Sequence, residues 1–176
     1  MASRTNEMIR RIRERTNELN RTRDVTILTL ASLAETRDNE TGAHILRTQR
    51  YIKALAEHLR SHPRFAGEID DETIDLLYKS APLHDIGKVG IPDAILLKPG
   101  KLTPDEYEEM KKHPVYGGRM LENAESRLLK LARNIALSHH EHWDGTGYPY
   151  GLKGEEIPIE ARIVSVVDVY DALTTR

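Results

Sequence analysis

Residues 138–149 have the sequence SHHEHWDGTGYP, in which histidines precede a loop rich in glycine. His139 and His140 are adjacent, and His142 follows two positions later. Neither the packing of a helix nor the folding of a loop requires two adjacent histidines. The pair therefore suggests ligands of a metal ion, and such ligands need partners elsewhere in the chain.

Further residues with metal-ligand chemistry follow a distinctive order. In chain order they are Glu40 with His44, His84 with Asp85, His113, and Asp168. Glu40 and His44 share a face if a helix includes both, because four residues make about one helical turn. Carboxylates crowded in an interior are unfavourable without cations. Adjacent helical residues point about 100° apart, so each doublet, His84–Asp85 and His139–His140, is expected to reach two neighbouring ions.

Composition limits the classes of protein. The 176 residues suit one domain, with 39% hydrophobic and 31% charged residues. There is no apolar run of 18 residues and no secretory signal, which predicts a cytoplasmic protein without a membrane span. A net charge of −2 gives no basic field for DNA. Because cysteine is absent, a metal must bind imidazole and carboxylate, which suit iron, manganese and zinc.

Residues 1–23 differ from the rest, with seven arginines and three glutamates. Met8, Ile12 and Leu19 are spaced like one stripe of a coiled coil. A solvated helical tail and a dimerising linker helix explain this short segment equally well. We expect the helix to continue through residues 24–38, with Val25, Leu28, Ala31 and Leu33 on its buried face.

The remaining pattern predicts helices and no strands. Ile45, Ile52 and Ala56 have helical spacing after a break near residues 39–42. Acidic residues at 70–72 can cap the start of another helix, and amphipathic helices are expected at 126–140 and 159–176. Thr103 as N-cap, with proline at 104 and glutamate at 106, predicts a helix that runs towards His113. Residues 143–158 are expected to form a loop.

Three segments, residues 35–51, 84–118 and 139–176, closely resemble the HD-GYP family of bacterial cyclic di-GMP phosphodiesterases, a branch of the HD phosphohydrolases. The second begins HDIGKVGIP, and the third contains HHEHWDGTGYP. The resemblance covers about residues 24–176. It implies an all-α HD-domain helical bundle, here with a long N-terminal linker helix, and a centre of two or three divalent ions, commonly iron or manganese.

Carried over position by position, the resemblance implies a set of metal ligands. They are Glu40, His44, His84, Asp85, His113, His139, His140 and Asp168. Glu40 matches a position whose carboxylate allows a third metal to bind in some members. Gly147–Tyr148–Pro149 is the motif that gives the family part of its name. His58 and His62 are expected to be surface residues.

The implied reaction is hydrolysis of cyclic di-GMP to linear pGpG, GMP or both. Two ions would lower the pKa of a bridging water and polarise the phosphoryl oxygens, so no side-chain nucleophile is needed. We expect Asp85 to anchor the ions and Lys88 to pair with a phosphate oxygen; the alternative for Lys88 is a solvated lysine. Asp38 has two possible roles. It would either hydrogen-bond a metal ligand or deliver a proton, or it would be a solvated residue at a helix end.

Three residues near the expected site have open roles. Tyr148 is available to contact a guanine, unless the glycine-rich loop is only a structural turn. Asp171 would either touch substrate or make an interior hydrogen bond. Trp143 is expected in the core. In the resembling family the loop is also linked to contacts with diguanylate cyclase domains.

The ends of the sequence suggest a piece of a larger protein. The family continues beyond Arg176 with further helices, so we expect an HD-GYP domain at 24–176 that is incomplete at its C-terminus. The arginine-rich start resembles the linker after a receiver domain in response regulators, and no receiver is present. An alternative to the active phosphodiesterase is a weak or inactive regulatory module that dimerises through residues 1–35 and binds partners through the GYP loop.

Overall fold

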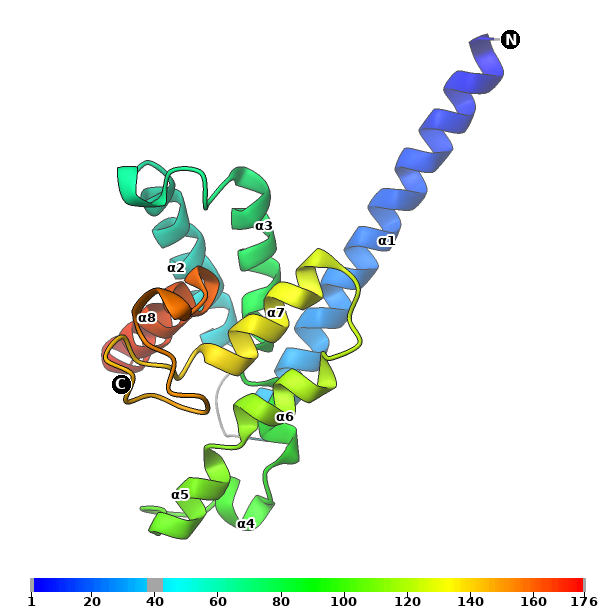
Figure 1. Cartoon of the computed structure of the whole chain (residues 1–176). Coiled ribbons are helices and arrows are strands. Elements are labelled where there is room, and N and C mark those ends of the chain that lie inside the picture. The colour runs from blue at the N-terminus through cyan, green and yellow to red at the C-terminus, as the bar shows by residue number, and fades with distance from the viewer. Residues whose placement is uncertain (1, 38–42, 176) are drawn as a thin grey trace.

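The computed structural model describes residues 2–37 and 43–175, which form helices joined by loops and contain no strand (Figure 1). The elements are α1 (Ala2–Thr36), α2 (Ala43–Arg60), η1 (Pro63–Phe65), α3 (Asp71–Ser80), η2 (Ala81–Leu83), η3 (Ile86–Gly90), α4 (Asp93–Leu96), α5 (Pro104–Met110), α6 (His113–Met120), α7 (Arg127–Ser138), η4 (Gly154–Glu156) and α8 (Ile159–Thr174). The predicted all-α fold is confirmed. None of the described helices combines the length and apolar character needed to cross a membrane.

The main core lies where α2, α3, α7 and α8 meet. Ile52 and Ala56 of α2 pack in one cluster with Leu77 of α3, Ile135 of α7 and Val164 of α8. All five side chains are buried, and full burial of a large aliphatic side chain stabilises a fold by about 1.5–3 kcal/mol. His44 lies in α2, and His139 and His140 directly follow α7, so these helices position three of the histidines.

Helix α1 has two parts with different surroundings. Its N-terminal half extends away from the rest of the molecule, and every side chain from residue 4 to residue 23 is exposed (Figure 1). Its C-terminal half packs through Ile27 and Ala31 against Leu83 of η2 and Leu128 of α7. The helix thus reaches the elements around the His84–Asp85 doublet.

The expected buried face of α1 was partly wrong. Val25 and Leu33 are each 63% exposed, whereas Ile27 and Ala34 are buried. The buried positions follow the 27, 31, 34 spacing of a helical face, so the packed stripe is rotated towards the small alanines.

The helix that begins at residue 104 ends earlier than expected. Thr103 and Glu106 form the predicted capping box, but α5 stops at Met110. A new helix, α6, begins at His113 with Pro114 in its first turn. Proline disfavours helical geometry in the residue before it and lacks an N–H, so the chain breaks there. His113 is therefore at the start of a helix and not at its end.

Candidate metal centre

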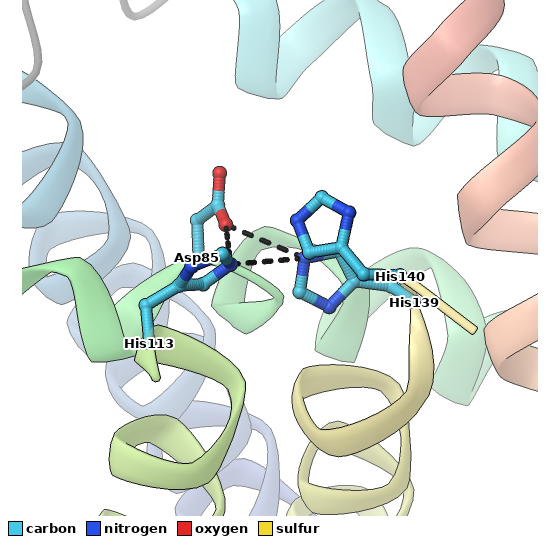
Figure 2. Close-up of side chains that lie close together, drawn as sticks. All are labelled: Asp85, His113, His139 and His140. Atoms are coloured by element: carbon cyan, nitrogen blue, oxygen red, sulfur yellow. Dashed lines mark hydrogen bonds and ion pairs between the residues drawn. The ribbon is translucent and has the colours of Figure 1, made fainter. Parts of the chain in front are cut away.

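The first of two groups of potential ligands, here the first cluster, consists of Asp85, His113, His139 and His140. Asp85 lies between η2 and η3, His113 starts α6, and the histidine pair follows α7. Asp85 Oδ1 is 3.2 Å from His113 Nε2 and 3.4 Å from His139 Nε2. Figure 2 shows the imidazoles gathered beside this carboxylate. One ligand atom from each residue lies within 4.8 Å of all the others.

The second cluster consists of His44, His84 and Asp168. His44 lies in the first turn of α2, and Asp168 lies in α8. Asp168 Oδ1 is 3.6 Å from His44 Nε2 and 3.8 Å from His84 Nε2. His84 Nε2 is also 3.4 Å from Asp85 Oδ2, so the two clusters are neighbours.

A glycine permits the close packing that brings Asp85 to His113. Gly87 lies in η3, and a Cβ there would be 1.9 Å from the carbonyl oxygen of His113 and 2.4 Å from the amide nitrogen of Gly117. Both neighbours are backbone atoms and cannot move aside cheaply. Glycine therefore allows η3 to lie directly against the start of α6, which sets the position of the first cluster.

Backbone carbonyls fix the tautomers of three histidines. The Nδ1 atoms of His84 and His113 donate to the carbonyl oxygens of Ala81 and Met110, at 2.9 and 2.8 Å. Nδ1 of His139 lies 3.1 Å from the carbonyl oxygen of Ile135. A carbonyl only accepts, so in each neutral ring Nε2 carries the lone pair.

These lone pairs face one another inside the protein. Nε2 of His113 and Nε2 of His139 are 3.5 Å apart, although neither can donate when neutral. Nε2 of His84 is buried and makes no hydrogen bond to the described residues. Buried nitrogen lone pairs that converge on a carboxylate lack a positive partner. A divalent cation at each cluster would satisfy them, so the residues fit the group that the sequence implies.

The electrostatics keep the carboxylate charged. Burial alone would raise the pKa of Asp85, but Lys88 and the surrounding imidazoles hold that pKa well below its usual range. The Lys88 ammonium lies 2.8 Å from Asp85 Oδ2. The Lys88 side chain is only 15% exposed, so its ammonium lies beside the first cluster and not in bulk solvent.

The imidazoles differ in their tendency to bind a proton. Burial lowers the pKa of His139, and burial lowers the pKa of His140 to about 2. Both rings are thus neutral and can donate lone pairs near neutral pH, as metal ligands must. His84 is also desolvated, but Asp85 and Asp168 outweigh that effect and raise its pKa. A metal ion between those carboxylates would take the place of that proton.

The structure brings seven of the eight predicted ligands together. Glu40 lies outside the described residues, and so does Asp38. The His84–Asp85 doublet contributes one residue to each cluster, as expected, although it follows η2 and does not end α3. His139 and His140 both belong to the first cluster, so for this doublet the expectation of two ions is not met.

The GYP loop places an aromatic ring beside the first cluster. Tyr148 stacks on His140 with ring centroids 4.7 Å apart and planes 22° apart. The Tyr148 amide donates to the carbonyl oxygen of His140 at 3.1 Å. At Gly147 a Cβ would lie 2.3 Å from the amide nitrogen of His142, so only glycine fits this fold of the loop.

Two residues of this region escaped the sequence prediction. Glu141 is buried, and its carboxylate accepts hydrogen bonds from the amides of Tyr150 and Leu152, which fastens the loop. Arg47 binds Asp171. Arg47 lies three residues after His44 on the same helical face, and this spacing was the available signal.

The structure bears on two expectations about individual side chains. Asp171 is buried and bonds His44 and Arg47, which favours the interior hydrogen bond over a substrate contact. Trp143 was wrongly expected in the core, because it is 55% exposed. The guanidinium groups of Arg64 and Arg162 lie over its ring, 5.7 and 5.8 Å from the ring centroid, and such cation–π contacts suit a surface tryptophan.

A family model described as the HD domain matches residues 39–176. The chain belongs to the HD domain family. The matched region contains both clusters.

Known relatives of this HD domain extend the match. A cyclic di-GMP phosphodiesterase from Vibrio cholerae is 56% identical over 96% of this chain and 35% of its own length. The cyclic di-GMP phosphodiesterase response regulator RpfG from Xanthomonas campestris is 45% identical over 89% of the chain and 39% of its own length. A 3′3′-cGAMP-specific phosphodiesterase from Vibrio cholerae is 44% identical over 89% of the chain and 28% of its own length. The chain thus spans between 28% and 39% of the length of these proteins, and its resemblance to the HD-GYP phosphodiesterases is confirmed.

Proposed function

We propose that this HD domain is a metal-dependent phosphodiesterase that hydrolyses cyclic di-GMP to linear pGpG, GMP or both, as the output of a signalling protein. The observation that supports it most is the convergence of seven histidine and aspartate side chains in two neighbouring clusters. The names of the similar proteins supply the substrate.

The proposed ligands divide between the two clusters. Asp85, His113, His139 and His140 would hold one ion, and His44, His84 and Asp168 would hold another. Imidazole and carboxylate donors suit iron or manganese, and Glu40 is the proposed ligand for a third ion. Ions at these positions would supply a Lewis acid and an activated water for attack on phosphorus.

The protein's own side chains would complete the reaction. Lys88 projects its ammonium to the carboxylate of Asp85, so it can donate to a phosphoryl oxygen and stabilise the charge that develops on it. Tyr148 is half-buried against His140 and offers an aromatic edge to a guanine. Asp38 remains a proposal for proton delivery.

The test is product analysis. Protein purified without oxygen and loaded with Fe²⁺ or Mn²⁺ is incubated with cyclic di-GMP, and the nucleotides are separated by chromatography. We expect pGpG or GMP to appear, and chelation with EDTA to stop the reaction. Intact cyclic di-GMP in the presence of a fully loaded protein would contradict the proposal and favour a regulatory module without catalysis.

A second substrate has specific support, since a relative that is 44% identical is specific for 3′3′-cGAMP. Competition between equal amounts of cyclic di-GMP and 3′3′-cGAMP gives the ratio of the two kcat/KM values directly. A ratio above ten for either nucleotide identifies the preferred substrate.

We further propose a cytoplasmic signalling context. The exposed stripe of Met8, Ile12 and Leu19 on the projecting half of α1 would pair with a second copy of the chain, downstream of a receiver domain. The exposed Trp143 and Tyr150 flank the GYP loop and would take part in contacts with diguanylate cyclase domains.

A further inference from the structure

One ligand histidine is held by a side chain and not by the backbone. Nδ1 of His44 lies 2.8 Å from Oδ2 of Asp171, a residue that is only 2% exposed. Because a carboxylate at this distance accepts, the ring carries its proton on Nδ1 and its lone pair on Nε2. That lone pair faces Asp168, 3.6 Å away.

Arg47 completes the arrangement from the other side. Its Nε and Nη2 atoms donate to Oδ1 and Oδ2 of Asp171, both at 2.8 Å. The bidentate pair neutralises the buried carboxylate and fixes its plane.

The spacing along the helices links these partners to the ligands. Arg47 lies three residues after His44 in α2, and Asp171 lies three residues after Asp168 in α8. Each helix therefore contributes one ligand of the second cluster and, on the same face one turn later, one member of the ion pair. The ion pair sets how α2 and α8 meet at the level of the ligands.

We propose that Asp171, clamped by Arg47, is a positioning residue that fixes the tautomer and orientation of His44 and thereby governs metal binding at the second cluster. A carboxylate behind a ligating histidine also raises the basicity of the ring, and loss of such a partner lowers metal affinity by roughly 10–100-fold. In the first cluster, backbone carbonyls instead hold His113 and His139. The inference rests on the metal centre proposed above.

The first test measures binding of Mn²⁺ alone, by equilibrium dialysis of the full chain. We expect Asp171→Asn to weaken one ion per chain by about 10–100-fold and to leave the other within threefold of its wild-type affinity. Arg47→Ala should act on the same ion, and Arg47→Lys, which keeps the charge, should act less. His140→Ala should instead weaken the other ion, because it removes a ligand of the first cluster.

One control separates this effect from general destabilisation. Asp70→Ala removes the side chain that caps α3 by accepting a hydrogen bond from the Thr73 amide. It should lower the melting temperature and leave both Mn²⁺ affinities unchanged. If Asp171→Asn binds both ions like the wild type, or weakens the binding of both ions to the same extent, the inference is wrong.

A second measurement does not need metal. Long-range ¹H–¹⁵N correlation spectra of the histidine rings report the tautomer directly. The wild-type His44 ring should show a protonated Nδ1, and Asp171→Ala should give a mixture of tautomers, with His113 and His139 unchanged. An unaltered His44 signal in the variant would overturn the inference. Wild-type protein that binds no Mn²⁺ at all would instead contradict the proposed metal centre.

Discussion

The two clusters contain the same kinds of side chain, but the protein holds them in place by different means. In the first cluster, His113 and His139 are oriented by carbonyl oxygens of their own helical turns, three or four residues away. In the second, His44 depends on Asp171, which is 127 residues distant in sequence. His113 and His139 of the first cluster are thus oriented by local backbone geometry, whereas His44 of the second cluster is oriented only when α2 and α8 pack together. The difference implies that the second ion is the more easily lost.

The largest effect is expected from a change that breaks both clusters at once. The His84→Gln/Asp85→Asn double variant keeps the size of both side chains and removes one ligand from each cluster. Mn²⁺ affinity should fall by about a hundredfold or more at both sites, because loss of a residue that only hydrogen-bonds a ligand already lowers metal affinity by about 10–100-fold. Hydrolysis should stop. Metal analysis and circular dichroism check this. Full metal content in a folded double variant would refute the assignment.

A smaller effect is expected when charge is removed and both clusters stay intact. Lys88→Ala should lower kcat by about 10²–10³-fold with Mn²⁺ still bound, since Lys88 would stabilise charge on the phosphoryl group. Lys79→Ala is the matched control, because Lys79 forms an ion pair with Asp75 on the surface of α3. An unchanged kcat for Lys88→Ala would remove Lys88 from the mechanism.

A change in the GYP loop should affect the first cluster alone. Gly147→Ala introduces a Cβ against the backbone of residues 140–142, which would displace Tyr148 from His140. Overpacking of this kind destabilises by about 1–3 kcal/mol, and we expect weaker Mn²⁺ binding at the first cluster only. Gly100→Ala is the control. Gly100 lies in an exposed loop with a φ of +100°, and no atom lies within 4 Å of the new Cβ, so this variant introduces backbone strain but no steric clash. Equal metal binding in both variants would show that the loop does not support the cluster.

The smallest effect on the centre is expected from the projecting half of α1. Ile12→Glu places a charge on the exposed stripe and should abolish self-association, with both Mn²⁺ affinities unchanged. Sedimentation velocity of the wild type and the variant tests this. A wild-type protein that is monomeric at all concentrations would contradict the proposed dimer and favour the alternative, a solvated helical tail.

The sequence was sufficient to predict the fold class and most of the residues that converge in the two clusters. Helical spacing in α2 and the capping box at Thr103 are local signals, and the structure contains both. The adjacent pairs of potential ligands at 84–85 and 139–140 identified the centre because such pairs have no packing role.

What the sequence could not supply depends on contacts between distant segments. The rotation of α1, which exposes Val25 and Leu33, follows from how its alanines pack against η2 and α7. The division of ligands into two clusters requires knowing that η3 lies against α6. The partnership of Arg47 with Asp171 joins two helices that no local pattern relates.

The number of ions bound by the wild-type chain tests the central claim most directly. Protein purified without oxygen is dialysed against Mn²⁺, and bound metal is counted by elemental analysis. Two converging sets of lone pairs and carboxylates predict at least two ions per chain, with the second released more readily than the first. A folded protein that binds one ion or none would contradict the account.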